Sequence, residues 1–268
     1  MTRLVRAELL KLRTVRMPYG LLITAAVLTG LLAYVEASQA GRAGSSVESL
    51  ATQSGLAAVT TLTGWSMLLA AACGVTVASG EFRHATASLT YLATPRRVRV
   101  LVAKLVAAAC AGALFGLAAA VIATGAGLGL AAARGDRIAL GPGTLAWHLV
   151  GAVLGAALLA ALGTGIGSLI RSQLAGITGV FIWGLIAEPV IGGVFTSVRP
   201  YLPYAAATTL AGSSLGSGPG GFHVAVRTHG AVSVTGPLPF AAAAALVTGL
   251  VIVVSVLAAG TTVQRDVT

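Results

Sequence analysis

Six runs of mostly apolar residues divide this chain, and they restrict its fold more strongly than any other feature. They cover approximately residues 18–36, 56–79, 104–132, 146–170, 174–197 and 239–260. A helix needs about 20 apolar residues to cross the hydrocarbon core of a bilayer, and no run alternates polar and apolar residues as a membrane-barrel strand does. The sequence therefore predicts an all-α membrane protein in which residues 1–268 form one domain with six transmembrane helices.

The charge content agrees with a surface that faces lipid. Charged residues make up only 9% of the chain, whereas a soluble domain carries about 25%. The net charge of +10 would favour nucleic acid as the partner of a soluble domain. Here the basic residues lie mainly between the apolar runs, so we interpret them as determinants of membrane orientation and expect no binding to nucleic acid.

The distribution of Lys and Arg predicts which side of the membrane each loop occupies, because these residues accumulate on the cytoplasmic side. Twelve of them fall on one side of the six spans: Arg3, Arg6, Lys11, Arg13, Arg16, Arg83, Arg96, Arg97, Arg99, Lys104, Arg171 and Arg265. The other side has five: Arg42, Arg134, Arg137, Arg199 and Arg227. We therefore expect both termini in the cytoplasm, on the same side, as an even number of spans requires.

A cleaved signal peptide is the alternative interpretation of the first 40 residues. Five basic residues precede an apolar run, and Ser38-Gln39-Ala40 could be a cleavage site. The run at 18–36 is longer than the roughly 7–15-residue core of a signal peptide. We therefore expect the first span to be retained.

The N-terminal stretch TRLVRAELLKLRTVRM has the pattern of an amphipathic basic helix. Leu4, Ala7, Leu9, Leu12 and Val15 can share an apolar stripe. The basic residues of the stretch are Arg3, Arg6, Lys11, Arg13 and Arg16. Such a helix lies along the membrane surface with its charges toward anionic headgroups; an unstructured anchor that only fixes the orientation of the first span is the alternative.

The cytoplasmic loop between the second and third spans has a similar character. Phe82, Ala85, Leu89 and Leu92 fall at helical spacing, and Pro95 ends that pattern. A short helix with one apolar edge and charged flanks is suited to docking into a groove on a partner protein. The alternative is a charged loop that only enforces topology, which explains the arginines of the loop but not the apolar edge.

Glu188 is the one acidic residue well inside an apolar run, and Pro189 follows it directly. An ionisable group within a membrane is costly and marks a candidate functional residue. It lies about 21 Å from the cytoplasmic end of the fifth span at 1.5 Å per residue, where Pro189 is expected to kink or end the helix. A carboxyl group hydrogen-bonded to a neighbouring helix, or one that reaches the outer interface, is an equally good interpretation.

Two further patterns concern packing and the region after the fifth span. GxxxG pairs at 112/116, 125/129, 151/155 and 163/167 permit close approach of helices, but so glycine-rich a chain contains such pairs by chance, so they identify no interface. Residues 199–238 contain several Pro, Gly and Ser residues and are predicted to be mostly loop. Within them, 201–212 is apolar enough to form a short re-entrant helix.

The sequence contains neither a GxxxxGK[ST] phosphate loop nor an HExxH zinc motif. We therefore expect the chain to hold no ATP through such a loop and to have no catalytic site, no metal site and no cofactor of its own. Cys73 and Cys110 stand alone in apolar runs and are interpreted as packing residues.

Four segments together give the chain a resemblance to a known family. They are RAELLKLRTVR at 6–16, GEFRHATASLTYLATPRRVRVLVAK at 80–104, LGTGIGSLIRSQLAGI at 162–177 and RPYLPYAAATTLAG at 199–212. In order and spacing they resemble the permease subunits of ABC-2-type ABC transporters, and the resemblance covers nearly the whole chain. Ala85-Thr86 departs from the Gly-Thr that members of the family often have at that place.

The resemblance implies an elbow helix at residues 2–16, a coupling helix within 80–94, and ATP-driven export. It implies a separate ATPase subunit that binds ATP and Mg²⁺, and a second permease subunit, identical or different, in a bacterial plasma membrane. The residues implied to contact the ATPase are Glu81, Phe82, Arg83, Leu89 and Leu92. The 15 arginines against two lysines are in keeping with a GC-rich bacterial genome.

Two other functions are compatible with the residues. A self-contained secondary transporter usually has several charges or broken helices near the membrane midplane, whereas this chain offers essentially Glu188. A non-transporting membrane anchor or assembly protein is the other alternative.

Overall fold

The computed structural model describes residues 1–42, 45, 47–83, 97–138, 140–170, 172–212 and 238–260. All regular structure in these residues is helical. The α-helices are α1 (Thr2–Thr14), α2 (Arg16–Gln39), α3 (Gln53–Thr60), α4 (Gly64–Arg83), α6 (Arg97–Arg134), α7 (Pro142–Ile170), α8 (Gln173–Ile182), α9 (Glu188–Val194), α10 (Pro203–Leu210) and α11 (Phe240–Ala258). A π-helical turn, η1 (Trp183–Ala187), joins α8 to α9, and a short 3-10 turn, η2 (Arg199–Tyr201), precedes α10.

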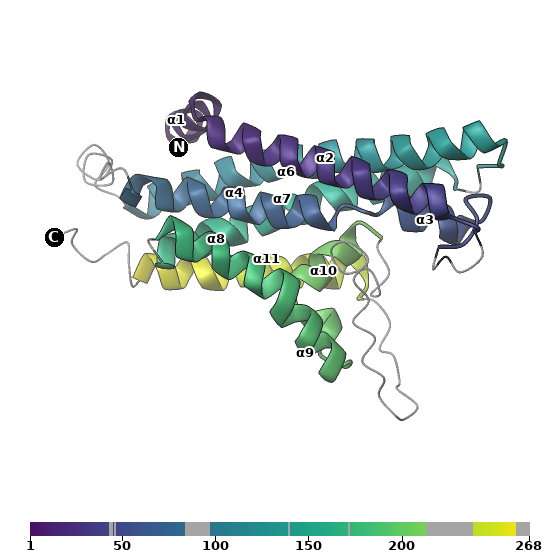
Figure 1. The fold of residues 1–268 in the computed structure, drawn as a ribbon. Coiled ribbons are helices and arrows are strands. Elements are labelled where there is room, and N and C mark those ends of the chain that lie inside the picture. The colour runs from purple at the N-terminus through teal and green to yellow at the C-terminus, as the bar shows by residue number, and fades with distance from the viewer. Residues whose placement is uncertain are drawn as a thin grey trace.

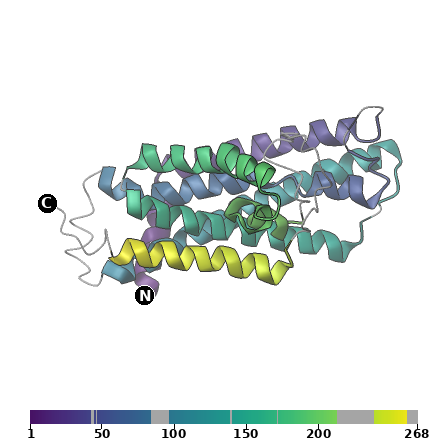
Figure 2. The ribbon, with the colours of Figure 1, turned by 90° about the horizontal axis from the view of Figure 1, so that it is seen from below.

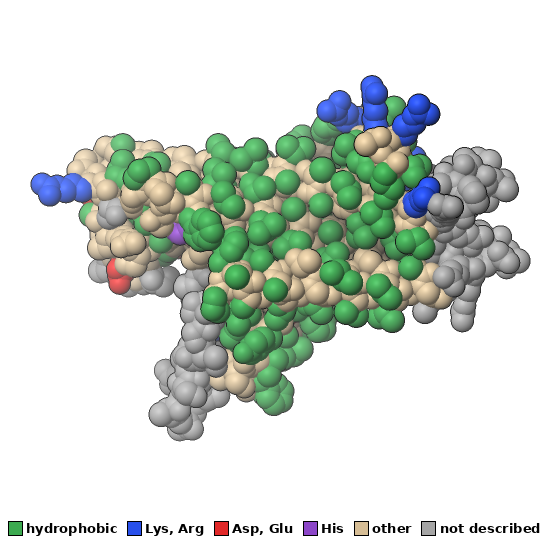
Figure 3. Space-filling model, turned by 180° about the vertical axis from the view of Figure 1, so that it is seen from behind, with side chains coloured by type: hydrophobic (Ala, Val, Ile, Leu, Met, Phe, Trp, Pro, Cys, Tyr) green, Lys and Arg blue, Asp and Glu red, His purple; other side chains and the backbone are tan. Residues whose placement is uncertain are grey.

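Six helical segments are long and apolar enough to cross a membrane, which confirms the predicted number. They are Arg16–Gln39, Gln53–Gly80, Val98–Arg134, Pro142–Ile170, Gln173–Val194 and Phe240–Ala258. The long helices run side by side along one axis, while α9 leans away from it (Figures 1 and 2). Hydrophobic side chains cover the surface between the two ends, and most of the visible Lys and Arg side chains gather at the α1 end (Figure 3).

The sequence predicted one continuous helix for the second span. In the structure this span is interrupted between α3 and α4. The hydroxyls of Thr60 and Thr61 donate to the carbonyl of Ala57, at 3.2 and 2.8 Å. Such local side-chain bonds compete with the helical ladder. Gly64 then restarts the helix directly against the Tyr204 hydroxyl, where a Cβ atom would collide. The break therefore lets α10 pack against the start of α4.

The third span begins at Arg97, seven residues earlier than predicted. Lys104, the predicted first residue of this span, is only 5% exposed. Its ammonium group has an acidic partner, so it lies inside a helix that continues on both sides of it. A lysine with a buried partner does not mark the end of a span.

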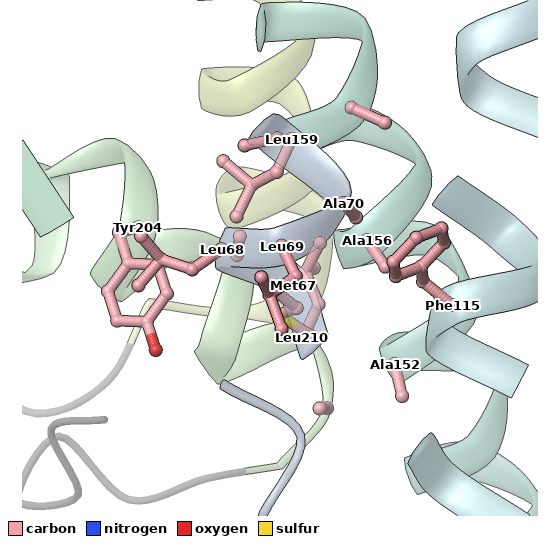
Figure 4. Close-up of a cluster of buried hydrophobic side chains, with 14 of the residues drawn as sticks. Met67, Leu68, Leu69, Ala70, Phe115, Ala152, Ala156, Leu159, Tyr204 and Leu210 are labelled. Atoms are coloured by element: carbon pink, nitrogen blue, oxygen red, sulfur yellow. The ribbon is translucent and has the colours of Figure 1, made fainter. Parts of the chain in front are cut away.

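The core is built from small residues where α4, α6 and α7 meet. Gly74 of α4 lies against the carbonyl of Ala160 in α7, and Gly163 of α7 lies against the carbonyl of Ala71 in α4. A Cβ atom at either glycine would collide with that carbonyl, so the two backbones are in direct contact. Larger side chains fill the spaces beside this contact; Figure 4 shows Met67, Leu68, Leu69, Phe115, Leu159 and Leu210 among them.

The two ends of the bundle can be identified from the clusters that close them. At one end, Leu101 of α6 packs with Ala258 of α11 and with Leu169 of α7. At the opposite end, Ala37 of α2 packs with Leu56 of α3 and residues of α6. Helix α1 lies across the first of these ends, roughly perpendicular to the long helices (Figures 1 and 2).

Candidate functional site

Helix α1 is amphipathic, as predicted, but its inner face differs from the predicted stripe. Its basic side chains Arg3, Arg6, Lys11 and Arg13 are exposed, as is Arg16 at the start of α2. Leu4, Val5, Leu9 and Leu12 are partly covered, and Glu8 is the only fully buried residue of the helix. Ala7 and Val15, which were assigned to the apolar stripe, are exposed. The helix has its polar residue Glu8 in the middle of its buried face.

Glu8 is neutralised there by the only two lysines of the chain. Lys104 Nζ lies 3.2 Å from Glu8 Oε2 and 3.3 Å from the carbonyl oxygen of Val77 in α4. Lys11 Nζ lies 2.7 Å from Glu8 Oε1, and the Lys11 side chain is 49% exposed. A buried carboxylate is tolerated only when it is paired and hydrogen-bonded. This ion pair therefore joins α1, α4 and α6 at a single point.

The segment predicted to dock on a partner joins α4 to α6 at the same end. Glu81, Phe82 and Arg83 belong to the last turn of α4. Leu89 and Leu92 lie outside the described residues. The predicted contacts of these five residues stay predictions. Val77 and Lys104 flank the segment on either side, so the Glu8 pair is within two turns of α4's end and two turns of α6's start.

Glu188 lies in the second polar site of the bundle and is 3% exposed. Its Oε1 accepts hydrogen bonds from Trp183 Nε1 at 2.6 Å and from the backbone N–H of Tyr204 at 2.8 Å. Its Oε2 accepts from the backbone N–H of Ala205 at 3.0 Å. The two backbone groups are in the first turn of α10, where N–H groups have no partner within the helix. The carboxyl group thus caps α10 and fixes it to the α8–α9 segment.

The π-helical turn before Glu188 follows from Pro189. Proline has no N–H, so an α-helix would leave the carbonyl four residues earlier without its partner. A π-helical turn at Trp183–Ala187 changes the hydrogen-bond pattern at this place, and the helix continues to Val194 without ending at the proline. The turn also brings Trp183, five residues before Glu188, within hydrogen-bond distance of its carboxyl group.

Tyr204 lies beside Glu188 with its ring pointing toward the α3–α4 break. Burial and the nearby Glu188 carboxyl group raise the pKa of its phenol, so the hydroxyl stays protonated. That hydroxyl finds no hydrogen-bond partner among the described residues. The predicted short helix in 201–212 is confirmed as α10, which is packed against α7 and α11.

An apolar cavity of about 260 Å³ extends from Glu188 along the space between α7 and α8. Leu68 and Ala71 of α4 form its floor, Leu159 to Ile170 of α7 one wall, and Gly179 to Gly184 of α8 and η1 the other. The fifth span contacts α4 closely: a Cβ atom at Gly176 of α8 would lie 2.6 Å from a Val75 methyl group, and one at Gly184 of η1 would lie 2.8 Å from a Leu68 methyl group. The side chains that face it from α7 across the cavity are Leu159, Leu162, Ile166 and Ile170.

Comparison with known proteins assigns no family to the chain. No protein-family model matches the sequence, and no curated protein matches it significantly.

Sequence reasoning identified Glu188 and the two polar segments but missed the partners that complete both sites. The sequence pattern marks Lys104 as an orientation signal at the start of a span and gives Glu8 no role. Their pairing has one signal in the sequence: Glu8 is the only acidic residue of the basic N-terminal stretch. Nothing in the sequence points from Glu188 to Tyr204 and Ala205, because a backbone N–H carries no residue-type information.

Proposed function

We propose that this chain is the permease subunit of an ATP-driven ABC exporter in a bacterial plasma membrane. It would pair with a second permease subunit and work with a separate ATPase subunit, which binds ATP and Mg²⁺. Both termini, α1 and the segment between α4 and α6 would then face the cytoplasm. Helix α1 would serve as the elbow helix at the membrane surface.

The observation that carries the proposal is the ion pair of Glu8 with Lys104. It fastens the amphipathic helix α1 to α6, and Lys104 also donates to the Val77 carbonyl of α4. These two helices are the ones that the predicted coupling segment connects. A force applied to that segment would therefore reach α1, α4 and α6 together.

The packing of the core supports transmission of such a movement. Helices α4 and α7 are in backbone contact at Gly74 and Gly163, so neither can slide without moving the other. The fifth span packs on α4 and lines the cavity opposite α7. Movement of α4 and α7 as one body would change the width of the space beside the fifth span. Such a movement would provide alternating access.

Co-purification with an ABC ATPase encoded beside this gene tests the proposal. We expect a stable complex from detergent or nanodiscs, and loss of most of it with Glu81→Lys or Arg83→Glu. Arg42→Glu, a charge reversal at an exposed residue beyond the other end of α2, is the matched control and should leave the complex intact. Membrane insertion should be the same for all three variants.

The rival function makes the opposite prediction. A secondary transporter would move its substrate in proteoliposomes that contain this chain alone and an ion gradient. Such transport, with no ATPase bound, would overturn the proposal. So would complexes that survive both Glu81→Lys and Arg83→Glu unchanged.

A further inference from the structure

We infer that the cavity between α7 and α8 binds one hydrocarbon chain of a bilayer lipid. The inference concerns binding by this chain alone and requires neither an ATPase nor transport. It can therefore hold or fail independently of the proposed function.

The chemistry of the lining selects an apolar ligand. Leu68, Leu159, Leu162 and Ile166 supply aliphatic surface, and Gly179 and Gly184 leave backbone without side chains on the opposite wall. Glu188 is the one charged residue of the lining, and its two oxygens already accept three hydrogen bonds from Trp183, Tyr204 and Ala205. A polar ligand would lose its hydrogen bonds to water on entry and would find few groups in the lining to replace them. An aliphatic ligand has no hydrogen bonds to lose and gains van der Waals contact with the walls.

The shape of the cavity selects a chain over a compact or flat molecule. Along α7 the lining runs from Leu159 to Ile170, which is about 16 Å at 1.5 Å per residue. The volume of about 260 Å³ is small for that length. The cavity is therefore a narrow furrow, and one extended hydrocarbon chain is the ligand that fits it along its whole length.

The surroundings make a membrane lipid the source of this chain. Ile170 and Trp183 belong to the lining and are both 43% exposed, so the cavity reaches the apolar outer surface of the bundle. Ile170 is the last residue of α7 and stands near the membrane surface in any spanning arrangement. The headgroup would accordingly stay at the Ile170 end, and the end of the chain would point toward Trp183 and Glu188.

A photoactivatable lipid tests this arrangement on the purified full chain in nanodiscs. The probe is a phosphatidylethanolamine with a diazirine near the methyl end of one acyl chain. Mass spectrometry should place its crosslinks on residues 180–184 and on 159–166. A second probe, with the diazirine near the ester, should label residues around Ile170 instead.

Filling the cavity provides the matched comparison. Gly179 lines the cavity, and a Cβ atom there would meet nothing within 4 Å, so Gly179→Leu adds a side chain to the lining with no clash at its Cβ atom. Gly125 in α6 is equally open but is not part of the lining, so Gly125→Leu is the control. Crosslinking inside the cavity should fall about tenfold with Gly179→Leu, as exclusion of a ligand requires, and should not change with Gly125→Leu.

Ile166→Phe fills the same space from α7 and is the alternative variant if Gly179→Leu does not fold.

Three results would overturn the inference. Crosslinks spread evenly over the exposed faces of α2 and α11 would indicate annular lipid only. Crosslinks that survive both filling variants would place the chain elsewhere. Displacement of the probe by a flat polycyclic compound, but not by a linear fatty acid, would show that the cavity takes a different class of ligand.

Discussion

Glu8 and Glu188 are buried to a similar degree, 6% and 3% exposed, in two regions of the bundle that stabilise a carboxyl group in opposite ways. At the α1 end, Glu8 is held by the ammonium groups of Lys11 and Lys104. Beside α10, Glu188 is held by three neutral N–H donors, one from an indole and two from a helix N-terminus. The first region pairs the carboxyl group with two ammonium groups, and the second surrounds its oxygens with neutral donors.

Because their partners differ, the two sites should tolerate different substitutions. An ion pair joins two side chains and can be inverted, because exchanging acid and base keeps the charges balanced. A carboxyl group at a helix N-terminus cannot be inverted, because the backbone N–H groups are fixed as donors. Glu8 therefore depends on the identity of its partner, whereas Glu188 depends on remaining an acceptor.

Lys104→Ala should have the largest effect on stability. It leaves the buried Glu8 with only the half-exposed Lys11, and breaking a buried pair costs about 3 kcal/mol. Unfolding of the purified protein in mixed detergent micelles would measure the loss. Arg6→Ala, which removes an exposed basic residue of the same helix, is the control and should change little.

Exchanging the acid and the base of the Glu8–Lys104 pair tests whether this site, unlike that of Glu188, can be inverted. The double variant Glu8→Lys with Lys104→Glu should recover part of the stability that either single reversal loses. If the double variant is no more stable than the single ones, the ion pair is not what holds α1 in place.

Glu188→Gln should have the next largest effect, a loss of about 2 kcal/mol, because the amide has one acceptor oxygen instead of two and leaves a buried N–H of α10 without its acceptor. The amide also presents N–H groups to a site made of donors. Amide exchange of α10 would report the loss directly. Glu36→Gln in α2 replaces an acid that is only partly buried and should have a much smaller effect. Unchanged protection of α10 would contradict its capping by Glu188.

Trp183→Phe should cost about 1 kcal/mol, since it removes one hydrogen-bond donor and leaves two in place. Trp147→Phe is a matched control, because Trp147 is 53% exposed and contacts Phe240 ring to ring. Thermal unfolding of the two variants side by side would separate the indole N–H from the loss of ring area. Equal losses would mean that the Trp183 bond contributes nothing.

Lys11→Ala should have the smallest effect, below about 0.5 kcal/mol, because an ion pair with one exposed partner is screened by water and salt. The stability difference from the unsubstituted protein should decrease further between low and high salt. A loss as large as that of Lys104→Ala, insensitive to salt, would show that Lys11 and not Lys104 neutralises Glu8.

Most ends of the spans could be predicted from the sequence to within a few residues. The ends that could not be predicted are set by contacts with residues distant in sequence. The fourth and sixth spans were placed within four residues of α7 and α11. The interruption of the second span arises where Tyr204, from a distant part of the chain, packs against Gly64. The third span was started too late, because the partner of Lys104 is 96 residues away from it.

The glycine pairs show the same limit. Gly112 and Gly116 bring α6 against Ala156 and Ala152 of α7. Gly125 and Gly129, nine residues on along the same helix, have open space where a Cβ would be. The sequence pattern is identical at both places, and only the position of the neighbouring helix distinguishes a contact from an exposed surface.

The sequence by itself determined that the chain has six apolar helical spans and which segments between them are basic. These properties depend on composition over about 20 neighbouring residues, and the cost of exposing backbone groups to lipid enforces the helix. Tertiary structure alone decided the partners of Glu8 and Glu188, the contact of α4 with α7 and the furrow beside α8. Each of these depends on the separation of two surfaces that are distant in sequence, and no local pattern carries that separation.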